Sequence, residues 1–388
     1  MTSSPQCFPA SEFEARATRA QAAMDSLGLS ALLLSTEPEV RYFTGFLSRF
    51  WESPARPWFV ILPAQGKPVA VIPAIGAALM GRSWIDDIRT WRSPDYTDDG
   101  IGLLASALMD LTPKGARIGV PADLETHVRM PLNSWTRLND SLEGRQLVGD
   151  ANCMRRLREV KSEAEIDKIR TACSIANRAF DRVPEIARAG VPLARVFRDF
   201  QRLCLEEGAD WVPYLAGGAA PQGYGDVISP ADERPLQGGD VMMLDTGLVH
   251  DGYFCDFDRN YSVGPPSPQV AEGHHRLIEA TQAGFKAARV GATAADVFAA
   301  MDQIVTGGAG GSDAGRFGHG LGMQLTETPS LIPDDHRVLE AGMVLTLEPG
   351  VDLGDGKLMV HEENIVIRPD GAEWLSAPSS PAIREIAL

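Results

Sequence analysis

The feature that most constrains the fold of this chain is a set of five metal-ligand side chains that lie far apart in its last third. Four are carboxylates and one is an imidazole: Asp245, Asp256, His319, Glu348 and Glu362. This hard, mostly oxygen donor set suits two divalent ions such as Mn²⁺ or Co²⁺. Two such ions, held about 3.5–4 Å apart, can generate hydroxide at neutral pH and polarise a substrate carbonyl. If the five residues form one cage, the chain must fold so that these distant segments meet.

Asp245 and Asp256 are predicted to lie on the two arms of one hairpin. The runs 240–245 and 253–258 are largely apolar, and the Asp251-Gly252 dipeptide between them is a strong hairpin signal. A turn near 250–251 would place Asp245 almost opposite Asp256, with Cβ atoms about 4.5–5.5 Å apart. Buried carboxylates at that separation repel each other, so a cation between them is favoured. For this segment alone, the alternative is a solvated hairpin tip with ordinary acidic residues.

The other three residues stand in local sequences that favour ligands. His319 is flanked by Gly318 and Gly320, which let the backbone crowd the imidazole. Glu348 ends a strand-like run just before a Pro-Gly break. Glu362 opens another predicted strand. Each residue has an ordinary explanation by itself, and it is their order and spacing that indicate a metal centre.

In order and spacing, the five residues resemble the ligands of the pita-bread metallohydrolases, the family of prolidase, aminopeptidase P, methionine aminopeptidase and creatinase. The resemblance extends over essentially the whole chain. It implies an α+β fold, in which a pita-bread catalytic domain with a curved antiparallel sheet follows a smaller α/β creatinase-like domain. We expect the N-terminal domain at 1–155 and the metal-binding catalytic domain at 156–388.

Local patterns predict helices and strands in both domains. A capping box beginning at Ser11 predicts a helix that stops at Gly28. A second capping box, beginning at Ser162, predicts a helix that ends at Gly190. Further elements are expected as strands at 31–34, 58–63 and 68–73 and as helices near 268–288 and 294–305.

Composition limits the partners and the compartment. The chain has 36 Lys and Arg against 52 Asp and Glu, a net charge of −16, without a basic stripe, which argues against nucleic acid or an anionic membrane as partner. Five scattered cysteines without CxxC pairs indicate reduced thiols in a cytoplasmic protein. No apolar run is long enough for a transmembrane helix, and the N-terminus lacks the features of a signal peptide. The family resemblance and the tryptophan-rich loop 51–58 imply a homodimer.

Two histidines that the peptidases of this family share are absent here. One normally lies about seventeen residues before the first metal aspartate, where this chain has Ile228. The other normally lies seven residues after the metal histidine, where this chain has Thr326 followed by Glu327. In the family these imidazoles hydrogen-bond the substrate carbonyl and the tetrahedral oxyanion, and removal of one such donor costs about 10²–10³ in rate. Candidates to replace them are Tyr224, Tyr253, His250 and His361.

Two further departures lie beside the ligands. Val360 stands where the family commonly has arginine, and His361 follows it. Asp258 stands where the family commonly has threonine. Asp258 could be a sixth ligand, an acceptor that supports the ligands, or a general base, and we favour a ligand or a supporting acceptor because Asp258 alternates with Asp256 on one strand face. His361 is either an ordinary strand residue or a catalytic group.

The resemblance also implies roles for these residues. Asp245 and Asp256 would bridge or chelate two divalent ions, His319 would bind one ion, and Glu362 the other or both. Glu348 would bind metal and carry the proton from water to the leaving nitrogen, and Glu327 would orient a neighbour or the substrate amine. The expected catalytic residues are therefore Glu348, Glu327, His361 and Asp258. Manganese is the first choice of metal, with cobalt, iron or zinc as alternatives.

Three functions remain open at this point. The first is a metal-dependent hydrolase resembling Xaa-Pro dipeptidases and aminopeptidases, in which metal hydroxide attacks an amide-type C–N bond of a small molecule or short peptide. The second is a specialised small-metabolite enzyme of the same fold, resembling creatinase, ectoine hydrolase or a lyase, because both substrate-handling histidines are absent. The third is a non-catalytic binding module, which is disfavoured because all five ligands are present.

Overall fold

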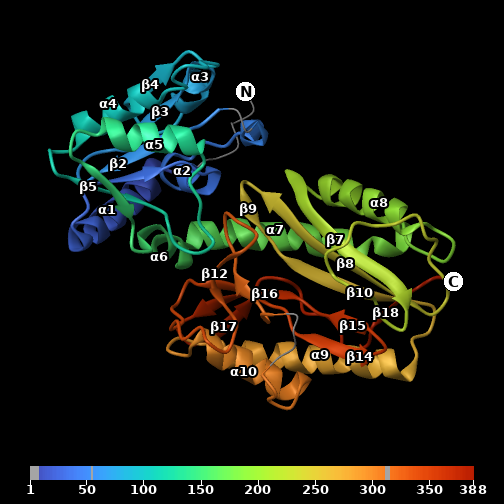
Figure 1. Ribbon diagram of the computed structural model, residues 1–388. Helices are drawn as coiled ribbons and strands as arrows, with labels where there is room; N and C mark the ends of the chain where they lie inside the picture. The colour runs from blue at the N-terminus through green and yellow to red at the C-terminus, as the bar shows by residue number, and fades with distance from the viewer. Residues whose placement is uncertain (1–7, 54–55, 311–314) are drawn as a thin grey trace. The chain divides into compact units, whose positions relative to one another are not determined.

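The computed structural model describes residues 8–53, 56–310 and 315–388, and the chain divides into two compact units between Arg158 and Glu159 (Figure 1). We expected a division at 155/156. The observed division falls inside helix α6, which spans Cys153–Glu159.

The first unit is built on one six-stranded mixed sheet with the strand order β4-β3-β2-β1-β5-β6. Its buried core lies between this sheet and helices such as α4, with Phe59, Ile61 and Leu104 among the fully buried side chains. The helices and strands in chain order are α1 (Ala10–Leu27), β1 (Ala31–Leu34), α2 (Glu37–Thr44), β2 (Phe59–Pro63), β3 (Val69–Pro73), α3 (Ala77–Met80), β4 (Ile88–Trp91), α4 (Ile101–Leu111), β5 (Arg117–Val120), α5 (Leu132–Ser141), β6 (Gln146–Gly149) and α6.

The first helix ends as predicted but begins differently. Helix α1 ends at Gly28, whose φ of +64° is the left-handed conformation that glycine adopts readily. The capping box predicted at Ser11 is wrong, because α1 begins at Ala10 with Pro9 as its N-cap, and Ser11 already lies inside the first turn.

The second unit contains two five-stranded sheets, each of which follows a pair of helices in the sequence. Helices α7 and α8 precede the sheet β18-β10-β8-β7, to which β9 adds by pairing with β8. Helices α9 and α10 precede the sheet β12-β11-β13-β16-β17, and Figure 1 shows them on the side of the unit away from α8. The elements are α7 (Glu163–Asp181), α8 (Leu193–Glu206), β7 (Trp211–Pro221), β8 (Asp240–His250), β9 (Tyr253–Phe254), β10 (Phe257–Val263), α9 (Pro268–Ala287), α10 (Ala294–Val305), β11 (His319–Gly320), β12 (Glu327–Ser330), β13 (Val344–Leu347), β14 (Gly350–Gly354), β15 (Lys357–Val360), β16 (Glu363–Arg368), β17 (Gly371–Trp374) and β18 (Arg384–Ile386).

The prediction for helix α7 is correct at the start of the helix and wrong at its end. Ser162 forms the predicted capping box with Glu165. The helix nevertheless ends at Asp181 and does not continue to Gly190. Pro184 explains the early end, because a proline that far into a helix would remove a backbone hydrogen bond and clash with the preceding turn.

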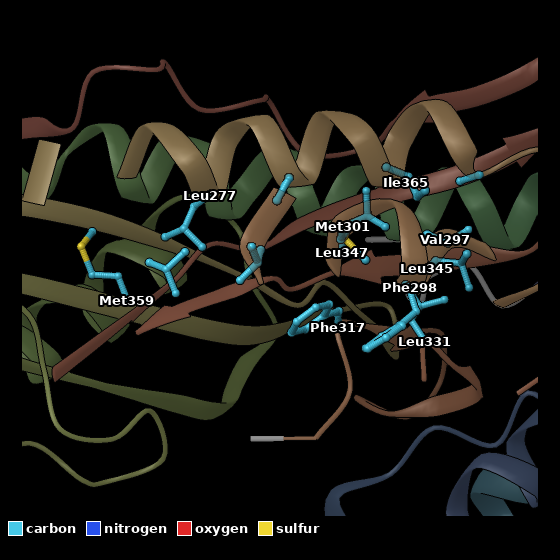
Figure 2. Close-up of a cluster of buried hydrophobic side chains, with 14 of the residues drawn as sticks. Leu277, Val297, Phe298, Met301, Phe317, Leu331, Leu345, Leu347, Met359 and Ile365 are labelled. Carbon is cyan, nitrogen blue, oxygen red and sulfur yellow. The ribbon is translucent and has the colours of Figure 1, made fainter. Parts of the chain in front are cut away.

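A large apolar cluster fixes the strands that border the candidate site. Helix α10 contributes Phe298 and Met301, which lie near Leu345 and Leu347 of β13 and Ile365 of β16 (Figure 2). Full burial of each such side chain stabilises the fold by roughly 1.5–3 kcal/mol. The cluster therefore holds the end of β13 and the start of β16, which are the points where Glu348 and Glu362 lie.

Candidate metal centre

The two aspartates of the hairpin are not opposite each other. Asp245 lies in the middle of β8, and the register of β8 with β10 pairs it with Asp258. The expectation that Asp245 faces Asp256 is therefore wrong by two positions. Asp256 lies in a break between β9 and β10, where regular pairing with β8 is interrupted.

Asn364 explains the break. The backbone N–H of Asp256 donates to Oδ1 of Asn364 at 3.0 Å, and Nδ2 of Asn364 donates to the carbonyl oxygen of Asp256. A side chain from β16 thus satisfies both backbone groups of Asp256, so this residue leaves the β-ladder without burying an unpaired polar group. The carboxylate of Asp256 then lies 3.3 Å from Nε2 of His319, which comes from the other sheet.

His319 is held by close backbone packing on both sides. A Cβ atom on Gly318 would lie 2.3 Å from the carbonyl oxygen of Thr346, and one on Gly320 would lie 2.1 Å from that of Thr328. Only glycine fits at such distances. Nδ1 of His319 lies 2.8 Å from the carbonyl oxygen of Gly320, which assigns the proton of the neutral ring to Nδ1 and leaves Nε2 available as a ligand.

Thr346 links His319 to Glu348. Its hydroxyl oxygen accepts the backbone N–H of His319 at 2.9 Å, and the hydroxyl donates to Oε1 of Glu348. The same Oε1 lies 3.0 Å from Nε2 of His319. One threonine thereby orients two of the candidate ligands toward each other.

Within the part of the chain that the structure describes, the five side chains form two groups whose ligand atoms lie within 4.8 Å of one another. The groups are Asp256, His319 and Glu348, and Asp245, Asp256 and Glu362. Because Asp256 belongs to both, the arrangement is that of two adjacent sites with one shared carboxylate.

The carboxylates of the cage are buried close to one another, and this shifts their pKa values. Burial, with the charges of neighbouring carboxylates, raises the pKa of Asp245 and of Glu362 well above their usual values. Burial also raises the pKa of Asp256, to about 6. Burial disfavours the charged form of His319, but Glu348 and Asp256 outweigh it and raise its pKa to about 10. For Glu348, burial is outweighed by His319 and Thr346, which lower the pKa.

These residues fit a pair of divalent ions. Oδ1 of Asp245 is buried and has no hydrogen-bond partner, although buried carboxylate oxygens are normally satisfied. Four carboxylates and one imidazole match the donor preference of Mn²⁺ and similar ions. A bound cation would also remove the repulsion that raises the pKa of Asp245 and Glu362.

The other predicted site residues lie outside both groups. Glu327 accepts from Nζ of Lys161 at 3.0 Å and from the backbone N–H of Gln324 at 3.2 Å. Oδ1 of Asp258 accepts the backbone N–H of Glu362 at 2.9 Å. His361 is buried, with Nδ1 3.2 Å from Asp258. Asp258 and His361 therefore lie behind a ligand, in contact with its backbone or with each other.

Both tyrosines considered as replacements for the missing histidines form hydrogen bonds with other residues. Tyr224 donates to Oδ1 of Asn260 at 3.1 Å and accepts the backbone N–H of Val360 at 2.7 Å. Tyr253 donates to Glu165 at 2.9 Å. His250 ends β8, beside the hairpin turn.

Tyr214, which no sequence motif singles out, lies beside the cage. Tyr214 is on β7 opposite Gly247 of β8, is half-buried, and lies close enough to Asp245 and Glu362 for their charges to act on its phenol. Burial, followed by the charges of Asp245 and Glu362, raises its pKa, which keeps the phenol protonated and able to donate. Only the pairing of β7 with β8 brings Tyr214 to the site, and no local pattern predicts that register.

Arg316 is a second residue near the cage that no sequence motif singles out. Its Nη2 lies 3.4 Å from Oγ1 of Thr326, the position of one missing histidine, and its charge favours the ionised forms of Asp256 and Glu348. Its place three residues before His319 is the only sequence signal that could have drawn attention to it.

Comparison with known proteins agrees with this geometry. Residues 16–160 match the creatinase/prolidase N-terminal domain, and residues 167–369 match metallopeptidase family M24. A protein of Mycobacterium tuberculosis named probable dipeptidase PepE is 31% identical over 369 residues, 94% of each chain. The crystal structure of dipeptidase PepE from Mycobacterium ulcerans is 29% identical with a TM-score of 0.83, over 99% of this chain and 100% of that one.

The fold is shared more widely than the sequence. The recombinant prolidase from Thermococcus sibiricus has a TM-score of 0.84 at 23% identity, over 99% of this chain and 100% of that one. A creatinase-like first unit and a pita-bread second unit, with carboxylate and histidine groups that could bind metal, define a metallohydrolase. The chain belongs to metallopeptidase family M24.

None of the helices in the described part of the chain is both long enough and apolar enough to span a membrane.

Proposed function

We propose that this enzyme hydrolyses an amide-type C–N bond in a substrate of dipeptide size, with two divalent ions of which Mn²⁺ is the first candidate. The observation that carries this proposal is the membership of Asp256 in both ligand groups. The names of the relatives, a probable dipeptidase and a prolidase, support dipeptides as the first substrates to test.

The residues of the cage would have different roles in this reaction. Asp256, His319 and Glu348 would hold one ion, and Asp245, Asp256 and Glu362 the other. Bound ions of this kind supply Lewis acidity and activate water at neutral pH. Glu348 is oriented by Thr346, and its lowered pKa keeps it a carboxylate that can accept a proton from water and pass it to the leaving nitrogen.

Tyr214 is the proposed donor to the oxyanion that develops on the substrate carbonyl. Replacing Tyr214 by phenylalanine removes only the hydroxyl, and we expect kcat to fall about 10²-fold or more, the effect of losing one such donor. Metal content, measured by mass spectrometry of the dialysed protein, should stay unchanged. Tyr261→Phe is the matched control, since its buried hydroxyl donates to the carbonyl oxygen of Phe180 and touches no proposed ligand. An unaltered kcat in Tyr214→Phe would show that Tyr214 does not donate to the oxyanion.

Two kinds of substrate fit this reaction, a dipeptide and a restricted, non-peptide molecule, and the residues at the two histidine positions favour the second. Ile228 is 78% exposed and its side chain cannot donate a hydrogen bond. Thr326 can donate, but it is shorter than histidine and carries no charge. A peptide substrate would therefore lack two contacts that the family's peptidases provide.

A substrate panel separates the two candidates. We expect weak cleavage of Xaa-Pro dipeptides and longer Xaa-Pro peptides in Mn²⁺, faster cleavage of a creatine-like or ectoine-like compound, and improved peptide cleavage in Thr326→His. The measurement is kcat/KM for each substrate. Efficient Xaa-Pro cleavage by the unmodified enzyme, near about 10⁴ M⁻¹s⁻¹ or above, would establish it as a peptidase that does not need the histidines.

A further inference from the structure

A buried ion pair directly after Thr326 has no role in the function proposed above. Nζ of Lys161 donates to Oε2 of Glu327 at 3.0 Å, and the two side chains are only 2% and 8% exposed. The attraction between two such charges barely offsets the cost of removing them from water, so the pair contributes little to stability. What it does fix is the position of Glu327 relative to Lys161, although the two residues are far apart in the sequence.

The lysine end of the pair is fixed to the core of the second unit. The backbone N–H of Lys161 donates to the carbonyl oxygen of Gly342 at 3.0 Å. The preceding residue, Val160, forms a β-bridge with Met343, which is buried in the apolar cluster directly before β13. The ammonium group therefore has a fixed place from which it can hold Glu327.

The glutamate end of the pair fixes the loop 321–326, which connects β11 to β12. Oε1 of Glu327 accepts the backbone N–H of Gln324 at 3.2 Å. The carboxylate also packs against Gly322, where a Cβ atom would lie 2.8 Å from Oε2. The loop therefore folds around this carboxylate, one oxygen of which faces the loop while the other faces Lys161.

Thr326 lies between two anchored residues. Before it, Leu325 packs against Gly247 of β8, where a Cβ atom would lie 2.2 Å from Cδ1 of Leu325. After it comes Glu327 with its ion pair. Thr326 itself is half-buried, and its Oγ1 accepts from Nη2 of Arg316 at 3.4 Å. The place of Thr326, where the peptidases of the family have a substrate-binding histidine, is therefore set by the contacts that hold its neighbours.

We propose that Lys161 and Glu327 are positioning residues, which act through the loop 321–326 to hold Thr326 against the substrate. The inference rests on the proposed function, and it gives Glu327 a part in the wall of the substrate site and none in proton transfer. This wall would contact the substrate in the ground state and in the transition state alike. Its displacement should therefore raise KM and leave kcat nearly unchanged.

The kinetics of Glu327→Gln on the fastest substrate of the panel test this role. Glutamine keeps the size of the side chain but leaves the ammonium group of Lys161 without a counter-charge. We expect KM to rise about 10-fold or more, since a displacement of about 1 Å can cost about 10²-fold. The content of metal ions and kcat should stay nearly unchanged. Glu185→Gln is the matched control, because it removes a carboxylate from an exposed ion pair with Arg182 in the same unit.

The double variant Lys161→Met with Glu327→Gln separates positioning from loss of stability. A single change leaves one buried charge unpaired, which destabilises the fold, whereas removal of both charges is tolerated. The melting temperature should therefore fall in Glu327→Gln and recover in the double variant, while KM stays raised in both. Recovery of KM together with the melting temperature would show that the pair is only structural.

Hydrogen exchange of the loop 321–326 supplies a readout that needs no substrate. The amide of Gln324 is bonded to Glu327, so the loop should lose protection in both variants, while the amides of β13 keep theirs. Unchanged exchange would overturn the positioning role, and faster exchange with an unchanged KM would overturn its link to the substrate. If the unmodified protein cleaves no substrate of the panel, the proposed function fails, and exchange still decides whether the pair holds the loop.

Discussion

Replacing Asp256 by alanine is expected to remove both ions and to reduce kcat/KM to below about 1% of the unmodified enzyme. Asp256 belongs to both ligand groups, so its loss leaves each ion with one ligand fewer. Loss of a residue that merely supports a ligand already costs about 10- to 100-fold in affinity or activity, and a shared ligand should cost more. Metal content by mass spectrometry and kcat/KM on the best substrate are the two measurements.

The matched control for this variant is Asp334→Ala, which removes an exposed aspartate of the same unit. It should retain both ions and full activity. If Asp256→Ala keeps the metal content of the unmodified protein, the assignment of the cage is wrong, whatever happens to activity.

Removing the ions is expected to lower the melting temperature of the catalytic unit by roughly 10–20 °C. An ion present at 100 times its Kd stabilises the folded state by about 2.7 kcal/mol, and two ions act together. For a unit of this size, each kcal/mol corresponds to about 2–4 °C. Scanning calorimetry of the chelated and Mn²⁺-saturated protein measures the difference directly.

The metal-free protein should also lose stability as pH rises. The pKa of Asp256 is raised to about 6 from an ordinary value of 3.8, so between these values the folded state binds more protons than the unfolded chain. Stability therefore falls across this window, and the raised pKa values of Asp245 and Glu362 extend the fall to higher pH. The pKa of His319, about 10, acts in the same direction, since its contribution is present below about 6.5 and is lost as pH approaches 10.

Calorimetry at two pH values tests this prediction. The chelated protein should melt at a lower temperature at pH 7.5 than at pH 5.5, and saturating Mn²⁺ should narrow or reverse the difference. An unchanged melting temperature after chelation at both pH values would contradict the account.

The five candidate ligands could be picked out from the sequence because most of them lie beside a local signal, and the structure brings their side chains together. Gly318 and Gly320 mark close backbone packing, a Pro-Gly break follows Glu348, and Asp-Gly marks the hairpin. The order of these signals along the chain indicated the family and with it the two-unit fold, which the comparisons confirm. A homodimer and a cytoplasmic location stay predictions.

What the sequence did not predict depends on contacts between segments that are distant along the chain. The place of Asp256 is decided by Asn364, whose side chain takes over its backbone hydrogen bonds. Tyr214 reaches the cage through the register of β7 with β8. Asp258 and His361 could be recognised as departures from the family, but their contact with each other required the structure.

The central claim, a hydrolase that needs two ions, is tested most directly by reconstituting the chelated enzyme with measured equivalents of Mn²⁺ and following hydrolysis of the fastest substrate of the panel. The account predicts negligible activity without metal and a rate that reaches its plateau at two equivalents per chain. Full activity after chelation, or a plateau at one equivalent, would contradict it.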